Sequence, residues 1–405
     1  MTNLLGAALA ALLALPTLAD EPRLSNDLLL PGTDTRVNVY GTVWLNSWYF
    51  LDQNLKDDAI LVPSDNAWDA SLTPDRQIGL TARYTRFGFC TTTPSVRWGE
   101  IKTVVEVDFS KDPGKTGGLN LRHAYVNLGR WTAGHTWSNW LDLDACAPTV
   151  DMNGPIGQAC NGASRFTQVR YTVPTGEPAR LAFSVEQNVN AWEFFKSANT
   201  PDPIGATRPD ARYPSFTGAW TFGDRWGHLG LRALAQNTGA FTPASLAQAE
   251  RRPNRWGGAG QVSGALKLGR NQLAGSVYAG RGLGEYGAGL QGARLVTSLD
   301  RLELYRNVGW QAGFTCNWTD RVRSSLLFSG VNFSSGSATR PKDIRNAFNG
   351  FVNTFVKLDK RAELGMEYGY EDLHTFGAGE VTQSNGSKSD RNQARKLQVS
   401  LTAKF

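Results

Sequence analysis

The stretch Leu-Gln-Val-Ser-Leu-Thr-Ala-Lys-Phe, residues 397–405, decides the fold. Apolar residues occupy every second position of this stretch, and polar residues stand between them. A period of two residues is typical of a β-strand with one apolar and one polar face. The stretch therefore predicts an amphipathic strand that needs a partner edge.

Alternation of the same kind recurs along the chain and places charges on one face. Between residues 102 and 109, Lys102, Glu106 and Asp108 share one side, while Val105 and Val107 share the other with Thr103 and Phe109. A charge that faces lipid near the bilayer midplane costs about 2–4 kcal/mol. We therefore expect these charges to point into a water-filled lumen. A soluble β-sandwich is the alternative, and the many charged inner faces argue against it.

Turn signals divide the alternating stretches into hairpins. Seven short turns are predicted at 93–96, 127–130, 174–178, 223–224, 269–271, 319–320 and 359–360. Eight long polar connections are predicted at 53–80, 111–118, 138–163, 188–212, 237–255, 283–303, 334–344 and 374–393. Bacterial membrane barrels have an even number of strands, short periplasmic turns and long outer loops. The sequence therefore predicts an all-β transmembrane antiparallel barrel of about 16 strands.

The first residues predict export. Leu4 to Leu18 are uncharged and rich in Leu and Ala, and small residues stand at Thr17 and Ala19. This pattern is typical of a secretory signal peptide, although Met1–Asn3 lacks the usual basic residue. We expect a signal peptide at 1–19, a short periplasmic segment at 20–34 and the barrel at 35–405. A buried N-terminal helix is the alternative for the first segment.

The charge of the chain favours anionic partners. The formal net charge is +6, and 30 of the 42 basic residues are arginine. Arginine binds carboxylates and phosphates with two parallel hydrogen bonds. Export makes nucleic acid an unsuitable partner, so small anionic solutes are expected. A surface that holds anionic lipid headgroups, or simply a GC-rich genome, would explain part of the same bias.

A barrel of this width leaves an aqueous channel, which selects by its narrowest point and by the charges around it. The alternation nominates a basic side of the lumen: Arg86, Lys102, Arg122, Arg170, Arg232, Arg323 and Arg361. It nominates an acidic side as well: Glu106, Asp108, Glu186, Glu363 and Glu367. Each of these residues has the alternative of a structural ion pair on the wall.

The long connection from Ser138 to about Gly162 follows the fifth predicted strand, and we expect it to fold inward as a constriction loop. It contains Asp142, Asp144 and Asp151. Cys146 and Cys160 lie in the same loop, and the oxidising compartment favours a disulfide between them. Two free thiols are the alternative.

Several segments resemble the DcaP-like porins, a family of trimeric outer-membrane channels associated with dicarboxylate uptake. The matching segments are 30–35, Arg86-Phe87-Gly88-Phe89, 91–94, 106–109, 121–125, Gly134-His135-Thr136-Trp137-Ser138-Asn139, Asn153-Gly154-Pro155 and 169–171. The resemblance covers mainly residues 30–190. It implies a homotrimer in the outer membrane of a Gram-negative bacterium and anionic or dicarboxylate substrates. The final residue, Phe405, also resembles the signal read by the barrel-assembly machinery, which together with outer-membrane lipid is an expected partner.

Other functions are less well supported by the residues. A barrel phospholipase needs a Ser–His pair oriented by a third group, and His135 with Ser138 lacks a clear orienting partner. A structural or plugged barrel would need an added domain or a plug. No His, Cys and carboxylate cluster suggests a metal, and we predict no cofactor and no catalytic residues. The sequence thus predicts a passive diffusion porin for small hydrophilic solutes.

Overall fold

The computed structural model describes residues 27–52, 76–111, 118–156, 165–176, 178–188, 208–210, 212–241, 250–287, 291–296, 301–336, 339–382 and 385–405. The predicted signal peptide, residues 1–19, lies outside them. Within the described residues, no helix has both the length and the apolar character to cross a membrane.

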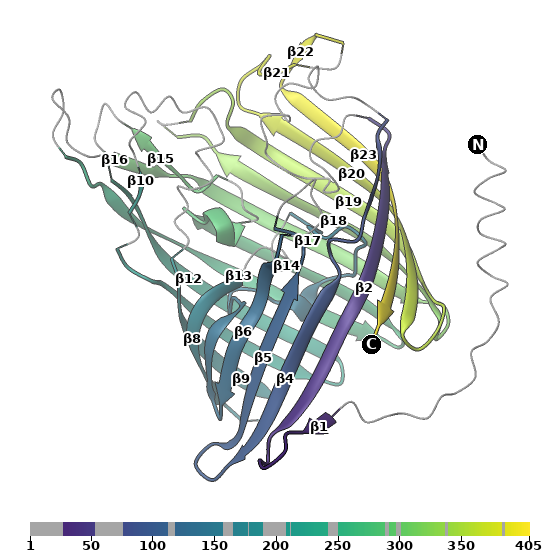
Figure 1. Ribbon diagram of the computed structural model, residues 1–405. Helices are drawn as coiled ribbons and strands as arrows, with labels where there is room; N and C mark the ends of the chain where they lie inside the picture. The colour runs from purple at the N-terminus through teal and green to yellow at the C-terminus, as the bar shows by residue number, and fades with distance from the viewer. Residues whose placement is uncertain are drawn as a thin grey trace, which may run out of the picture.

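Sixteen long strands form one closed antiparallel barrel in the described part of the chain (Figure 1). They are β2 (Arg36–Phe50), β4 (Arg86–Ser95), β5 (Gly99–Asp108), β6 (Asn120–Leu128), β7 (Trp131–Trp137), β8 (Arg165–Pro174), β9 (Ala179–Glu186), β11 (Ser215–Asp224), β12 (Gly227–Phe241), β13 (Asn254–Leu268), β14 (Asn271–Arg281), β17 (Arg306–Asn317), β18 (Val322–Ser334), β19 (Ile344–Lys357), β20 (Ala362–Thr375) and β23 (Arg391–Lys404). The predicted fold class and strand number are confirmed.

Shorter elements lie beside the barrel strands or in their connections. They are β1 (Asp27–Leu29), β3 (Ile78–Thr81), β10 (Arg208–Pro209), β15 (Ala293–Val296), β16 (Arg301–Leu304), β21 (Val381–Thr382), β22 (Lys388–Ser389) and the 3-10 helices η3 (Leu143–Ala145) and η5 (Gly284–Gly287). β1 pairs with the start of β2, and β3 extends the edge that β4 forms along β2.

The barrel closes between its first and last strands. Thr42 pairs with Lys404, and the antiparallel register continues to Phe50 and Lys396. On its other edge β23 pairs with β20. The predicted closing strand 397–405 is therefore the one that joins the two ends of the sheet, beside β2 in Figure 1.

The connections follow the predicted division into short and long. All seven short hairpins occur, but β4 continues through Ser95 and β11 through Asp224, so these two turns lie a few residues later than predicted. Gly129 and Gly269 take the positive φ angles of 56° and 65° that tight hairpins require. Some long connections are shorter than predicted because strands continue into them. β12 extends to Phe241, and the connection predicted at 283–303 contains the hairpin β15–β16.

The polarity of the wall is the reverse of that of a soluble protein. Outward residues such as Phe183, Val399 and Leu326 are 52%, 43% and 42% exposed. Their inward neighbours Ser184 and Ser400 are buried. The apolar side chains that cover the outside therefore face lipid, and the polar residues face the lumen, as the alternation predicted.

Candidate functional site: the inner loop and the arginine wall

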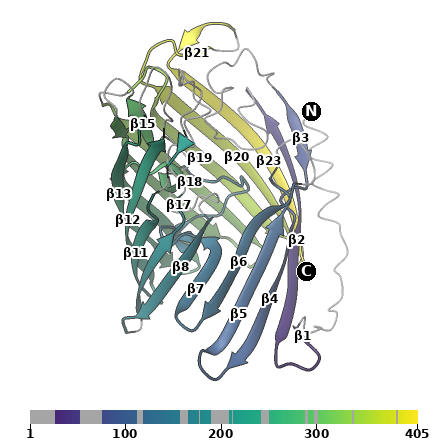
Figure 2. The same ribbon diagram turned by 60° about the vertical axis from the view of Figure 1, so that its left-hand side comes forward.

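The connection after β7 folds into the barrel, which confirms the predicted inward loop (Figure 2). We call its described part, residues 138–156, the inner loop. At its start, Ser138 Oγ and the Asn139 backbone N–H donate to the two oxygens of Glu186 at 2.7 and 3.0 Å. Tyr286 Oη donates to the same carboxylate at 2.9 Å. Glu186, predicted as a lumen acid, therefore anchors the loop to β9.

Asp142 provides the next anchor. Its carboxylate accepts hydrogen bonds from Arg232 Nη1 at 2.9 Å and Ser263 Oγ at 2.6 Å, and His228 Nε2 lies 3.0 Å away. Burial by itself raises the pKa of Asp142, but the hydrogen bonds from His228 and Ser263 and the charge of Arg232 together lower it to about 2. The carboxylate is thus ionised and neutralised by its neighbours on β12.

Side-chain amides of the wall hold the middle of the inner loop. Gln272 of β14 donates to the Asp144 carbonyl at 3.2 Å, and Gln311 of β17 donates to the Ala145 carbonyl at 2.7 Å. Asn353 of β19 donates to the carbonyl of Pro148 at 2.8 Å. The inner loop therefore runs along the wall strand by strand, and side-chain amides of the wall donate hydrogen bonds to its backbone carbonyls.

The far end of the inner loop is fixed to the last strands. Glu367 of β20 accepts the backbone N–H groups of Val150 and Asp151, each at 2.8 Å. The Asp151 carboxylate forms an ion pair with Lys396 of β23, and neither side chain is exposed. Two predicted charged residues, Asp151 and Glu367, therefore hold the loop and present no free charge to the pore.

The strands β4, β6 and β8 carry four inward-reaching arginines, Arg86, Arg122, Arg165 and Arg170, which we call the arginine wall. Arg122 donates to Glu106 at 2.7 Å and to Asp108 at 2.6 Å. Asp108 also accepts from Ser110 and Asn120. The single positive charge of Arg122 is thus shared between the two predicted lumen acids, Glu106 and Asp108.

Two of these arginines have no carboxylate partner at ion-pair distance in the described part of the chain. Arg86 lies over the ring of Trp44, 5.3 Å from its centroid, and its Nη2 is 3.9 Å from the sulfur of Met152 at the tip of the inner loop. Arg170 donates to the Trp137 carbonyl at 3.3 Å. Arg165 is repelled by the charges of Arg122 and Arg86, which places these three guanidinium groups near one another. The arginine wall therefore has an excess of positive charge.

The remaining predicted residues lie nearer the short turns. Arg323 forms a two-pronged ion pair with Glu363 at 2.5 and 2.8 Å. Lys102 is exposed near the start of β5, and Arg361 lies in the turn before β20 and not on the wall. Cys146 is disulfide-bonded, Cys90 and Cys316 are free, and Cys160 lies outside the described residues, so its pairing with Cys146 stays a prediction.

Sequence reasoning missed several charged residues, among them Lys396, Arg165 and the inward Glu371, which is 1% exposed. Lys396 shares its face with Gln398 and Ser400, so extending the alternation by one step would have found it. Arg165 gave no such signal, because its position has the phase of the outward Val169, while its guanidinium stacks on Trp137 at 3.6 Å from the ring centroid.

The Ser138–His135 pair that a phospholipase would need does not form between these described residues. Ser138 Oγ donates to Glu186, whereas a nucleophile would donate to its base. Among the described residues, no group of three or more His, Cys, Asp or Glu side chains is arranged to hold a metal ion.

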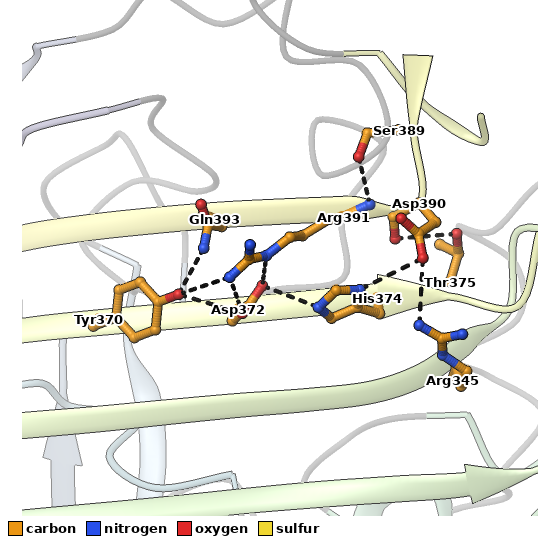
Figure 3. A network of polar contacts seen from close by, with 9 residues as sticks. All are labelled: Arg345, Tyr370, Asp372, His374, Thr375, Ser389, Asp390, Arg391 and Gln393. Carbon is orange, nitrogen blue, oxygen red and sulfur yellow. Dashed lines mark hydrogen bonds and ion pairs between the residues drawn. The ribbon is translucent and has the colours of Figure 1, made fainter. Parts of the chain in front are cut away.

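A second polar network lies on the outward faces of β20 and β23, near their outer ends (Figure 3). Arg391 donates two hydrogen bonds, of 2.7 and 2.6 Å, to the carboxylate of Asp372. His374 lies between Asp372 and Asp390, at 3.4 and 3.6 Å, and Gln393 donates to Tyr370 Oη at 2.6 Å. These charges satisfy one another at the rim, above the apolar band.

Comparisons with known proteins agree with the fold and the resemblance. The model of the family described as DcaP outer membrane protein matches residues 18–189. The outer membrane channel DcaP of Acinetobacter baumannii superposes with a TM-score of 0.74 at 21% identity, covering 93% of this chain and 99% of that one. No curated protein sequence matches the chain.

Two other solved structures share the barrel at lower identity. An anion-selective porin from Comamonas acidovorans has a TM-score of 0.59 at 12% identity and covers 92% of this chain and all of its own, 100%. OmpT, an outer membrane protein of Vibrio cholerae described in a trimer form, has a TM-score of 0.55 at 11% identity, with 92% and 99% covered. The resemblance to DcaP is confirmed, and the findings together support an outer-membrane porin.

Proposed function

We propose that this chain is a passive diffusion channel that prefers small anions, with dicarboxylates as its characteristic solutes. The observation that carries the proposal is the unequal use of charge around the lumen. The carboxylates of Asp142, Asp151 and Glu186 are all engaged by groups that hold the inner loop. Arg86 and Arg170 have no such carboxylate among the described residues.

A pore with this arrangement attracts anions. A ring or wall of one charge sign sets the preference of a channel for the opposite ion. Guanidinium groups add a geometric preference, because each offers a planar fork of N–H donors that matches a carboxylate. Several guanidinium groups on one wall would engage both ends of a dicarboxylate. The A. baumannii protein is an outer membrane channel and the C. acidovorans porin is anion-selective, which supports a channel and, from the second protein, a preference for anions.

The same resemblance supports a homotrimer. One structural neighbour is described in a trimer form. The outward face at the closing seam is strongly apolar, with Val43, Ile78 and Leu80 exposed by 51%, 77% and 68%. Crosslinking or native mass spectrometry of the folded protein tests this assembly, and a purely monomeric barrel would exclude it.

The test of anion preference is a planar-bilayer recording of reversal potential under a salt gradient. The wild type is expected to conduct with an anion-to-cation permeability ratio above one, and dicarboxylates are expected to block the current. The double variant Arg86→Gln/Arg170→Gln should lower this ratio toward one or below. The matched control is Arg225→Gln/Arg270→Gln, which removes two exposed charges from the short turns outside the lumen.

Three outcomes would overturn parts of the proposal. Cation preference in the wild type would exclude the argument from the arginine wall. Absence of conductance from folded protein would exclude the open channel and favour a plugged barrel. Hydrolysis of phospholipid micelles would bring back the enzymatic alternative, with Ser138→Ala as the variant to examine.

A further inference from the structure

A basic pocket lies at the outer rim of the barrel, away from the lumen site. It has a volume of about 380 Å³ and is lined by Arg255, Arg281, Arg301 and Arg306, with Glu303 as its one carboxylate. These residues come from β13, β14, β16 and β17. Figure 1 shows the β15–β16 hairpin at the same end of the barrel as β21 and β22, which is the end of the long connections.

Strand register brings two of these positive charges directly together. Arg281 of β14 is the pairing partner of Arg306 of β17. Like charges directly opposite each other destabilise an antiparallel pair. In the described part of the chain neither guanidinium has a hydrogen bond or ion pair. By contrast, Arg122, Arg323 and Arg391 each hold a carboxylate at 2.5–2.7 Å. Within the described residues, the juxtaposition of Arg281 and Arg306 is therefore not neutralised by an ion pair of either residue.

The alternation of both strands places these two arginines on the lipid side. Arg281 shares the outward face of β14 with Val277, which is 47% exposed. Arg306 shares the outward face of β17 with Val308, which is 46% exposed. Each arginine is the outermost residue of its strand, and so lies where the apolar band meets the headgroup layer. Ser334, which pairs with Arg306, adds a hydroxyl to the pocket.

The residues that line the pocket favour binding of a phosphate group. Four guanidinium groups around one carboxylate leave a net positive charge, and planar guanidinium forks bind phosphate oxygens in pairs. Arg255 donates one N–H to the Leu302 carbonyl at 3.2 Å, which ties it to the β15–β16 hairpin above the pocket. Basic pockets on membrane proteins at the water–lipid boundary bind anionic headgroups.

We propose that this pocket binds the phosphate group of an outer-leaflet lipid headgroup. Free inorganic phosphate offers the same chemistry. The lipid is favoured because Arg281 and Arg306 stand on the lipid-facing surface, directly above outward valines, where a headgroup is delivered together with its acyl chains. The site is independent of the proposed anion preference of the channel.

Native mass spectrometry of the full folded protein in detergent tests the site, with diphosphoryl lipid A as the probe. Dephosphorylated lipid A is the matched lipid, and inorganic phosphate is the soluble competitor. The variant is Arg281→Gln/Arg306→Gln. The matched control is Arg212→Gln/Arg345→Gln, which removes two exposed arginines of the outer end that are already paired with Asp210 and Asp390.

The variant is expected to lose about tenfold or more in affinity for the diphosphoryl lipid, since two charge-assisted contacts are removed. The control should bind as the wild type does, and the dephosphorylated lipid should bind weakly and equally to all three proteins. Equal affinity of variant and wild type for the diphosphoryl lipid would overturn the site. Displacement of the lipid by millimolar inorganic phosphate, dependent on the same arginines, would overturn the assignment to a lipid.

Folding and channel function are checked separately. The migration of unheated protein in gel electrophoresis reports the closed barrel, and bilayer conductance reports the pore. Both should be unchanged in the variant, because the two arginines are exposed and lie outside the lumen. If the wild type prefers anions but does not bind the lipid, only this proposal fails. If the wild type binds the lipid but does not prefer anions, only the proposed function fails.

Discussion

At the scale of residues, most charges in the lumen have structural roles. Lys396 and Asp151 form an ion pair in which neither side chain is exposed. Glu367 accepts two backbone N–H groups of the inner loop. Removing the partner of a buried charge lowers the stability of the folded state by several kcal/mol, so Lys396 and Asp151 each depend on the other. Asp142 of the inner loop is held in the same way by Arg232 and His228 of β12.

The variant Lys396→Met leaves Asp151 buried without its cation. We expect a loss of about 3–5 kcal/mol in the free energy that holds the inner loop, together with larger current fluctuations. The double variant Asp151→Asn/Lys396→Met should recover most of this loss, because an asparagine keeps the acceptor for the backbone of Asn153. Urea titration of the folded barrel and single-channel noise give the two readouts.

Arg395→Gln on the same strand is the control for this pair. Its ion pair with Asp52 is on the outward face, and the Arg395 side chain is 51% exposed. An exposed pair contributes at most about 1 kcal/mol. If Lys396→Met were as mild as Arg395→Gln, the assignment of Lys396 as an anchor of the loop would be wrong.

Sequence reasoning reached these residues only in part. The alternation placed Glu186 and Glu367 in the lumen, because the face of a residue depends only on its immediate neighbours. It did not show that their oxygens are occupied by the inner loop, since the contact of Asp151 with Glu367 joins residues 216 positions apart. Two of the five predicted lumen acids therefore anchor the inner loop, and the other three form ion pairs with arginines of the wall.

At the scale of elements, the inner loop is the segment that shapes the channel. The sequence predicted the polar composition of this loop, its Asn153-Gly154-Pro155 turn and its position after the fifth barrel strand. Its path along β9, β12, β14, β17, β19, β20 and β23 was not visible. That path depends on amide and carboxylate partners from strands that are distant in the sequence.

The disulfide of Cys146 is expected to stiffen this element. A bridge that closes a loop of this size stabilises it by about 3 kcal/mol through the entropy of the unfolded chain. The variant Cys146→Ser should therefore fold as a barrel but show a less stable conductance level. Peptide mapping without reductant should recover the peptide of Cys146 linked to that of Cys160. The control Cys90→Ser/Cys316→Ser removes the two free thiols and should change neither readout. A linkage of Cys146 to another cysteine would contradict the predicted pairing.

At the scale of the whole molecule, the apolar exterior and polar interior define where charge is tolerated. The strand number, the seven short turns and the facing of side chains were predicted because each is a local property of the sequence. The outward face of β18 offers a direct test. Leu326 lies toward the middle of the strand and is 42% exposed, whereas Asn332 is an exposed residue of the same face near the outer end of the strand.

Leu326→Arg should destabilise the barrel by about 2–4 kcal/mol, and Asn332→Arg by about 0–1 kcal/mol, because the cost of an outward charge falls with distance from the bilayer midplane. Equilibrium unfolding from lipid vesicles measures both values on the same strand. Equal costs at the two positions would show that this face does not contact the hydrocarbon core.

The anchoring of the inner loop also bears on the order in which the molecule is made. The loop follows the fifth barrel strand, but its far end is held by Lys396 on β23, the last strand of the chain. The loop therefore reaches its final position only once the closing strand is in place. A barrel without its last strand would be a wide and unselective channel. Pairing of β23 therefore closes the barrel and fixes the inner loop in the lumen in the same step.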